Sequence, residues 1–262
     1  MSAEPRRIRL DLAYDGTGFA GWQLQPGVRT VQGDLEAALS RLQGERPVRI
    51  RGAGRTDAGV HARAQVADCE IETELDDDDI GYALRRILPV DLRPCRVRTV
   101  SKDFHARNSA RSKTYAYHLD VSAAGDPFRA RYALHQPRPL DRDALEEALN
   151  RLPGRRDWSG FVGTLNGLRN TVRELTAVSV STPSDSELVL RFTADGFLYH
   201  MVRNLVGTLL EVGLGRREPD HVLHVLARRD RTLGGPTAAP HGLFLESVLY
   251  DEDLCGGADD RE

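Results

Sequence analysis

The sequence is poor in cysteine and lysine and has no long apolar run. Its three cysteines, Cys69, Cys95 and Cys255, show neither paired nor metal-ligand spacing, so nothing indicates a disulfide framework or a cysteine-based metal site. No apolar stretch approaches the length of a membrane span, and none follows the N-terminal residues as a signal peptide requires. We therefore expect a soluble, cytoplasmic protein without a membrane segment.

Two further motifs are missing, and each limits the chemistry. There is no glycine-lysine motif of the kind that cradles nucleotide phosphates, and there is no cluster of metal-ligating residues. We expect a protein that needs neither a metal nor another cofactor.

Arginine carries nearly all of the basic charge. Only Lys102 and Lys113 are lysines, so 34 of the 36 basic residues are arginines. The formal net charge of −3 is unevenly spread, because residues 251–262 carry −5 and the rest of the chain carries +2. Arginine binds phosphate through paired hydrogen bonds and stacks on bases, which suits an RNA-binding protein. A coding bias toward arginine explains the same composition equally well.

Hydrophobic periodicity predicts a β-α-β-β-α-β order, a ferredoxin-like unit, in the first part of the chain. The expected strands cover residues 8–14, 48–51, 67–71 and 95–100. One helix is expected after the capping residue Thr30, and a second is expected to begin in the aspartate run 76–79 and to stop at Pro89.

A second series of strands and helices, in a similar order, is predicted for the rest of the chain. The pattern predicts a strand over 113–120, a helix over 141–152, a hairpin of 172–180 with 188–194, helices near 200–213 and 219–228, and a strand over 243–250. Residues 155–170 show no period and predict a long loop. The fold class is therefore α+β, with two ferredoxin-like halves, 1–109 and 110–250, a catalytic cleft between them, and an acidic, disordered tail over 251–262.

The loop over residues 52–61 organises the predicted function. It holds three glycines, which permit positive φ or a close approach to a bound group, and a single carboxylate, Asp57. Asp57 could be an ordinary turn residue that makes a local hydrogen bond. Alternatively, it could be a lone acidic nucleophile beside Arg55.

Five stretches of the chain resemble, in order, the motifs of the tRNA pseudouridine synthase A family. GRTDAGVH at 54–61 resembles its active-site motif, and the others are YDGTGFAGWQ at 14–23, FHAR at 104–107, KTYAY at 113–117 and HMVRNLVG at 200–207. The resemblance implies the pseudouridine synthase fold, in which the sheets of the two halves merge, and a homodimer. It also implies a tRNA partner, isomerised at uridines 38–40 in the 3′ arm of the anticodon stem-loop.

The same resemblance implies roles for three residues. Asp57 corresponds to the catalytic aspartate, which attacks C1′ or C6 of the uridine. Tyr115 corresponds to the ring that stacks on the target base, although a tyrosine on a strand is usually packing. Arg203 corresponds to the partner of the catalytic carboxylate, although its place at the edge of a helical apolar stripe also allows it to reach solvent.

Other residues are expected to support these three. By resemblance, Arg55 holds the flipped-out nucleotide and contacts the RNA backbone, and Leu243 and Leu245 form an apolar floor under the base. A solvated loop arginine and ordinary core leucines are the alternatives. Tyr117 is expected only to pack. The motif histidines are expected to be hydrogen-bonded scaffold and not acid-base groups: His61, His105 and His200.

Two other function classes fit parts of this pattern. The first is a non-catalytic RNA-binding or chaperone protein, which would have no need of the trio Asp57, Tyr115 and Arg203. The second is a carboxylate-dependent glycosidase or nucleoside hydrolase. Such hydrolases need two carboxylates flanking the bond that they cleave, and the loop offers only Asp57.

Overall fold

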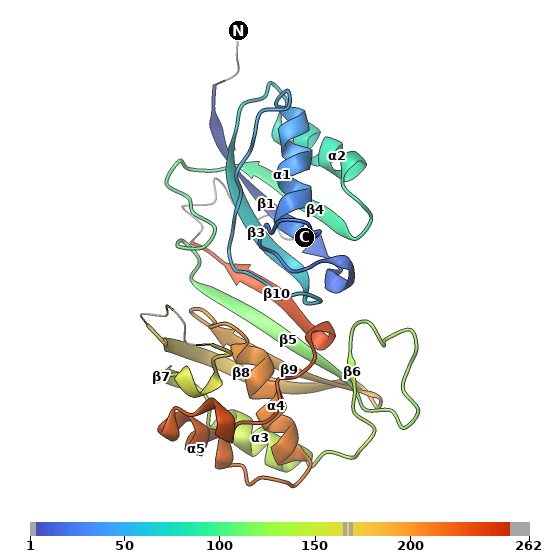
Figure 1. Ribbon diagram of the computed structural model, residues 1–262, viewed down its shortest axis with the longest axis vertical. Helices are drawn as coiled ribbons and strands as arrows, with labels where there is room; N and C mark the ends of the chain where they lie inside the picture. The colour runs from blue at the N-terminus through green and yellow to red at the C-terminus, as the bar shows by residue number, and fades with distance from the viewer. Residues whose placement is uncertain (1–3, 165–166, 168–169, 252–262) are drawn as a thin grey trace. The chain divides into compact units, whose positions relative to one another are not determined.

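The computed structural model describes residues 4–164, 167 and 170–251. The chain divides into two compact units (Figure 1): the first extends to Arg111 and includes the last strand from Leu245, and the second is Ser112–Phe244. The sequence-based boundary after residue 109 lies two residues from the first division point, but it keeps the last strand with the second half. The predicted division into two ferredoxin-like domains, 1–109 and 110–250, stays a prediction.

The first unit has the predicted β-α-β-β-α-β order. Its elements are β1 (Arg6–Tyr14), α1 (Val31–Leu42), β2 (Arg51–Gly52), β3 (His61–Ile71), α2 (Asp77–Ile87) and β4 (Leu92–Thr99), with a short 3₁₀ helix η1 (Gly16–Gly18) after β1. The strands lie in the order β4-β1-β3, β2 pairs with β3, and all these pairings are antiparallel. Helices α1 and α2 lie side by side on one face of this sheet (Figure 1).

Local sequence signals set most boundaries in this unit. The Thr30 side chain accepts a hydrogen bond from Gly33 N at 3.2 Å, and Asp76 accepts one from Asp79 N at 2.8 Å, so both helices begin where capping residues predicted. On β1 the side chains of Ile8, Leu10 and Leu12 are fully buried, as predicted. The predicted alternation holds at Asp11 and Ala13, which are partly exposed, but Arg9 is buried as well.

Three strands of the first unit differ from their predicted bounds by more than two residues. β2 has only two residues, β3 begins six residues before Ala67, and β4 begins three residues before Cys95. Residues 65–69 of β3 are all buried, so the strand has no solvent face and shows no alternation there. Pro94 lies inside β4, which is tolerated because β4 is the edge strand of the order β4-β1-β3.

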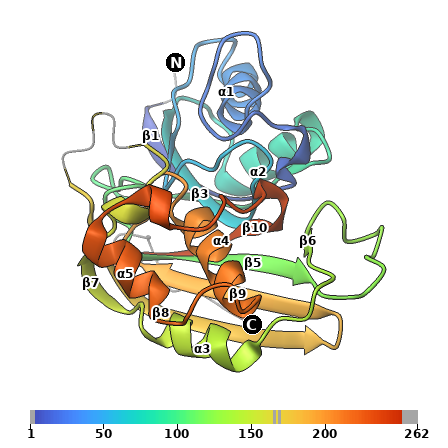
Figure 2. The same ribbon diagram turned by 60° about the horizontal axis from the view of Figure 1, so that its bottom comes forward.

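The second unit is built on a sheet in the order β5-β9-β8-β7. Its elements are β5 (Ser112–Asp120), β6 (Leu134–His135), α3 (Arg142–Asn150), β7 (Gly154–Asp157), η2 (Ser159–Phe161), β8 (Val172–Ser184), β9 (Glu187–Ala194), α4 (Met201–Gly213), α5 (His221–Arg228), η3 (Arg231–Leu233), η4 (Pro240–Gly242) and the start of β10 (Leu243–Leu249). Helices α3 and α4 cover one face of this sheet, with α5 beside them (Figure 2).

The prediction of a long loop over residues 155–170 is wrong in its first part. β7 pairs antiparallel with β8, and the turn η2 follows it. β7 lacks apolar side chains because it is an exposed edge strand, so it has no hydrophobic pattern to detect. The hairpin of β8 and β9 is longer than predicted, since β8 continues through Pro183 where β7 no longer pairs with it.

Two further predictions concern the acidic C-terminal tail and the absence of a membrane-spanning segment. Beyond Asp251 the tail lies outside the described residues, so its predicted disorder stays a prediction. Within residues 4–164, 167 and 170–251, no helix has the length and apolar character that a membrane crossing requires.

Candidate active site

Asp57 lies in the loop between β2 and β3, as the glycine pattern predicted. Its side chain is half-buried, and its carbonyl accepts a hydrogen bond from Val60 N at 3.1 Å, which closes a turn. Gly59 has a φ of +77° within this turn, a conformation that suits glycine. Arg55 is exposed on the same loop. The loop therefore presents a carboxylate from a turn that the main chain itself closes.

A buried carboxylate fixes the base of this loop. Asp68 on β3 is fully buried and accepts hydrogen bonds from Arg7 Nη1 at 2.8 Å and from Arg51 Nε at 3.1 Å. Burial raises the pKa of Asp68, and the Arg7 guanidinium opposes that rise. Because Arg51 belongs to β2, the ion pair joins the two strands from which the loop emerges. Gln65 Nε2 donates to Gly54 O at 2.9 Å and holds the loop from the other strand.

The segment over residues 15–22 packs against the Asp57 loop through glycines. A Cβ atom on Gly16 would lie 2.0 Å from Val60 O, and one on Gly21 would lie 2.8 Å from Thr56 O. Gly21 also has a φ of +98°. Any larger residue at Gly16 would have to displace the main chain of the loop. The glycines of the motif at 14–23 therefore have a structural role, because they allow the main chain of the Asp57 loop to pack closely against this segment.

Thr56, the residue before Asp57, is held at both its main chain and its side chain. Trp22 N donates to Thr56 O at 3.0 Å, and the Tyr14 hydroxyl lies 2.8 Å from Thr56 Oγ1. Burial raises the pKa of Tyr14 to about 12, so its hydroxyl stays neutral and keeps its proton for hydrogen bonding. These contacts fix the backbone next to Asp57.

Two of the motif histidines, His61 and His105, accept hydrogen bonds from the main chain, and the third, His200, stacks on a neighbouring ring. His61 is buried, and its Nδ1 accepts a hydrogen bond from Gly16 N at 3.0 Å. His105 Nδ1 accepts one from Arg107 N at 3.2 Å. His200 precedes α4 in a left-handed conformation, with its ring stacked on that of Tyr199 at 3.8 Å between centroids. These contacts fit the scaffold role expected from the sequence.

In the second unit, Tyr115 and Tyr117 lie two residues apart on β5. Tyr115 is 7% exposed, and its ring meets that of Phe197 edge-on, with centroids 5.1 Å apart. Tyr117 is fully buried, and its hydroxyl donates to Ala239 O at 2.8 Å. Burial raises the pKa of Tyr117 above its usual range. The burial of Tyr117 fits the packing role predicted for it.

Arg203 projects from α4 at the edge of the predicted apolar stripe. The stripe itself is buried: Val202, Leu205, Val206, Leu209 and Leu210. Arg203 Nε donates to the carbonyl of Ala238 at 2.8 Å, and Ala238 N donates to Arg203 O at 3.1 Å. The guanidinium is thus tied to the segment that follows η3.

A network on α4 holds that segment, and sequence reasoning missed it. The fully buried Asn204 accepts hydrogen bonds at Oδ1 from Thr237 Oγ1 at 2.7 Å and from Arg231 Nη2 at 3.0 Å. Its Nδ2 donates to Phe161 O at 2.7 Å. An asparagine within an apolar helical stripe was the available signal, because a buried amide requires partners.

Two glycines bring the same segment into main-chain contact with α4. A Cβ atom on Gly207 would lie 1.7 Å from Pro236 O, and one on Gly235 would lie 2.3 Å from Gly207 O. Thr208 Oγ1 accepts a hydrogen bond from Gly235 N at 2.9 Å. Together with Asn204, these contacts set the position of the Ala238 carbonyl that binds Arg203.

The remaining predicted residues are buried apolar side chains. Leu243 is 5% exposed, and Leu245 is fully buried. Asp57, Arg55 and Leu245 belong to the first unit, whereas the second contains Tyr115, Arg203 and Leu243. The meeting of the two sets in one cleft stays a prediction.

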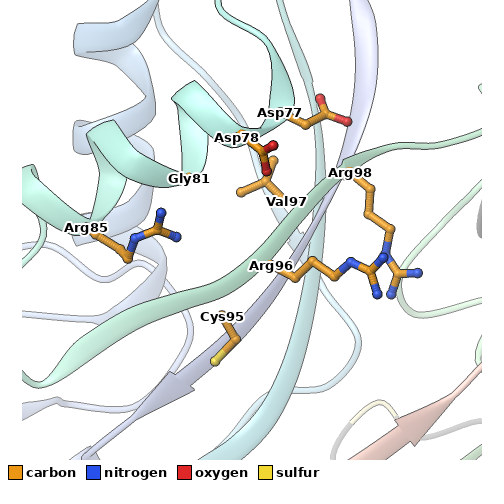
Figure 3. A pocket seen from close by; sticks show the side chains of 8 residues that line it. All are labelled: Asp77, Asp78, Gly81, Arg85, Cys95, Arg96, Val97 and Arg98. Carbon is orange, nitrogen blue, oxygen red and sulfur yellow. The ribbon is translucent and has the colours of Figure 1, made fainter. Parts of the chain in front are cut away.

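A pocket of about 260 Å³ lies in the first unit between α2 and β4 (Figure 3). It is lined by Asp77, Asp78, Gly81, Arg85, Cys95, Arg96, Val97 and Arg98. The lining mixes charges of both signs and includes none of the sequence-predicted site residues. In the part of the chain that the structure describes, no group of three or more His, Cys, Asp or Glu side chains is arranged to hold a metal ion.

Comparisons with a family model and with individual proteins point to the same family. A family model described as tRNA pseudouridine synthase matches residues 12–107 and 148–251. The tRNA pseudouridine synthase A of Streptococcus sanguinis is 40% identical over 247 residues, covering 94% of this chain and 99% of that protein. The tRNA pseudouridine synthase A of Streptococcus thermophilus is 41% identical over 246 residues, which again cover 94% of this chain and 99% of that protein.

Two solved structures of related function show a distant likeness to this chain. An H/ACA RNP bound to a substrate RNA containing 2′-deoxyuridine matches with a TM-score of 0.37 and 9% identity, over 78% of this chain and 44% of that one. A pseudouridylate synthase matches with a TM-score of 0.33 and 12% identity, over 96% and 67%.

Proposed function

Because the chain belongs to the tRNA pseudouridine synthase family, we propose that it isomerises uridine in the 3′ arm of the tRNA anticodon stem-loop, with Asp57 as nucleophile. Membership makes the protein a pseudouridine synthase, an isomerase that modifies tRNA. The observation that carries the finer proposal is the Asp57 carboxylate, presented by a braced glycine turn whose residues match the family's active-site motif. The cytoplasmic location expected from the sequence belongs to the same proposal.

The reaction explains why one carboxylate suffices. Forming pseudouridine breaks the N1–C1′ bond and joins C5 of the same base to C1′, without oxidation or reduction. An ionised carboxylate is a suitable nucleophile for such a step. The uridine must first leave its stack, which costs a few kcal/mol. We assign the attack on C1′ or C6 to Asp57 and stacking on the extruded base to Tyr115.

The geometry of Arg203 supports its assignment as the partner of the carboxylate. Its Nε is fixed on the Ala238 carbonyl, so the guanidinium plane has a defined orientation. Arginine binds carboxylates best when its planar fork is oriented in advance. A guanidinium next to a carboxylate also favours the charged form, which is the nucleophilic one. Leu243 and Leu245 would then close the site beneath the base.

Site mapping of pseudouridine on unmodified tRNA incubated with the purified protein tests the whole proposal. We expect modification confined to uridines of the 3′ arm of the anticodon stem-loop. A protein that binds tRNA and leaves every uridine unchanged would be a non-catalytic RNA binder. Release of free uracil would indicate a hydrolase. Modification at other positions would overturn the assigned site while leaving the reaction intact.

Binding should be strongly salt-dependent, and Arg55 should contribute to it. Arg55 is an exposed cation beside the proposed nucleophile, so it can neutralise an RNA phosphate. Replacing it by glutamine should lower the slope of log K against log salt by roughly 0.7–0.9, the contribution of one phosphate contact. Turnover should fall modestly as well.

Arg49→Gln is the matched control for Arg55, because Arg49 is exposed but paired with Glu36 at 3.0 Å. Titrations at several salt concentrations should leave the control's slope unchanged. If Arg55→Gln also retains the parent slope, Arg55 is a solvated loop residue.

We also propose that the enzyme is a homodimer and that one tRNA contacts both subunits. This expectation comes from the family resemblance. Sedimentation equilibrium at the concentration used for assays should give twice the chain mass of 29.1 kDa. A monomer with full activity at that concentration would contradict it.

A further inference from the structure

The loop between β5 and β6 carries the most exposed large apolar side chain of the described residues. Phe128 is 89% exposed, ahead of Val90 at 85%. Figures 1 and 2 both show this loop extending away from the sheet and helices of the second unit. A phenylalanine in that position forgoes the favourable burial that its ring would gain in a core or an interface. Such a residue suits contact with a partner.

The loop is held by its own hydrogen bonds at its base. The Asp120 carboxylate, at the end of β5, accepts hydrogen bonds from Ser122 N at 3.0 Å, Ser122 Oγ at 2.7 Å and Asp126 N at 2.7 Å. The ring of His135 lies with Nε2 2.9 Å from Ser122 O. The two ends of the loop are therefore tied together.

The tip is a single helical turn with a defined outward side. Asp126 Oδ1 accepts a hydrogen bond from Phe128 N at 2.9 Å, and Ala133 N donates to Arg129 O at 2.9 Å. Arg129 turns inward, where its Nη2 lies 3.0 Å from Glu187 Oε1. Phe128 and the exposed Arg131 are three residues apart, a spacing that places them together on a helical turn.

The charge around Phe128 selects the kind of partner. Of the three arginines in residues 121–140, Arg129 is paired with Glu187, whereas Arg131 and Arg138 are exposed, and the acidic residue within this range is Asp126. An exposed aromatic ring near the exposed Arg131 and Arg138 matches the sites that bind unpaired nucleic acid, where a base stacks on the ring and arginine binds the backbone. A second copy of the chain would need about 800 Å² of contact per partner, which one ring does not provide.

We propose that Phe128 is a stacking platform for an unpaired nucleobase of the RNA substrate, with Arg131 contacting the adjacent phosphate. The inference rests on the proposed function, since tRNA is the substrate considered. It assigns to the second unit a contact with the RNA outside the set Asp57, Tyr115 and Arg203. The contact should contribute to affinity and leave the bond-breaking step unchanged.

A tryptophan at position 128 reports the contact directly. The two native tryptophans, Trp22 and Trp158, are 2% and 0% exposed, so a tryptophan at Phe128 would be the one accessible to acrylamide. Adding unmodified tRNA to Phe128→Trp should quench its emission and protect it from acrylamide. Val90→Trp is the control, because Val90 is similarly exposed but its neighbour Asp91 is paired with Arg29. Its emission should change little.

Binding measurements separate stacking from charge. Phe128→Ala should weaken tRNA binding by about 5- to 100-fold, the range expected for one lost base–aromatic stack, with an unchanged salt slope. Phe128→Leu should also bind weakly, whereas Phe128→Trp should bind like the parent. Arg131→Gln should instead reduce the salt slope by roughly 0.7–0.9. Single-turnover rates at saturating tRNA should stay at the parent value.

The outcomes distinguish this inference from the proposed function. If the parent forms pseudouridine and Phe128→Ala binds tRNA within about twofold of it, the stacking platform is wrong and the enzyme assignment stands. If Phe128→Ala instead dissociates a dimer in sedimentation, the loop is an interface between copies. If tRNA binds and protects the tryptophan of Phe128→Trp, while neither this variant nor the parent forms pseudouridine, the proposed function alone is overturned.

Discussion

Replacing Asp57 by asparagine should reduce pseudouridine formation by at least about 10³-fold, the scale of losing an essential covalent group. The substitution removes the nucleophilic charge and keeps the size of the side chain. The turn should persist, because its hydrogen bond joins two main-chain groups, Val60 N and Asp57 O. Thr56 remains held by Tyr14 and Trp22. Affinity for tRNA should therefore stay within about threefold of the parent, a change of less than roughly 1 kcal/mol.

Single-turnover assays of Asp57→Asn and Asp57→Ala, beside their melting temperatures, measure this effect. Both variants should melt close to the parent and both should be inactive. Asp185→Asn, in the exposed turn between β8 and β9, is a matched control and should retain full activity. If Asp57→Asn makes pseudouridine near the parent rate while Asp57→Ala is merely less stable, Asp57 is a turn residue and catalysis resides elsewhere.

Local signals in the sequence were enough to predict much of the fold. β1 has one buried and one partly exposed face, and α1 follows a capping threonine, so both were found from periodicity. The start of β3 was missed because two of its buried side chains, His61 and Gln65, are polar and add nothing to a hydrophobic pattern. β7 was missed because Arg155 and Arg156 give an exposed edge strand no apolar pattern.

The candidate site divides in the same way. The Asp57 loop has a local signature of glycines around one carboxylate, so its position was predictable. The contacts that orient Arg203 are not local, because Asn204 bonds Arg231 and Thr237, which follow it by 27 and 33 residues. Such contacts depend on how α4 packs against a segment that follows much later in the chain. Hydrophobic periodicity is a local signal and does not predict that packing. The roles of Tyr115 and Arg203 came from family resemblance and remain predictions.

Gly207→Ala should destabilise the protein, although helix propensity alone predicts the reverse. In a helix interior, alanine is usually more stable than glycine by roughly 0.5–1 kcal/mol. At Gly207, however, the new Cβ would lie 1.7 Å from the carbonyl oxygen of Pro236, a main-chain atom. The segment must shift by more than 1 Å, so we expect a net loss of about 1–3 kcal/mol, typical of overpacking.

Gly81→Ala on α2 is the matched control for Gly207→Ala. A Cβ atom there would face the pocket in Figure 3, with its nearest neighbour the flexible guanidinium of Arg85 at 3.3 Å and Val97 at 3.6 Å. The same substitution should therefore follow propensity and raise stability by roughly 0.5–1 kcal/mol. Chemical denaturation of the two variants should give free-energy changes of opposite sign.

Gly207→Ala should also lower catalysis, since the displaced segment carries the Ala238 carbonyl that fixes Arg203 Nε. A shift of about 1 Å in a positioning group can cost on the order of 10²-fold in rate, so we expect a 10- to 100-fold fall in single-turnover rate. Affinity for tRNA should change little, because Gly207 is buried beneath the segment. Gly81→Ala should keep the parent rate. If Gly207→Ala is destabilised yet reacts at the parent rate below its melting temperature, the segment supports folding only, and Arg203 is not positioned through Ala238.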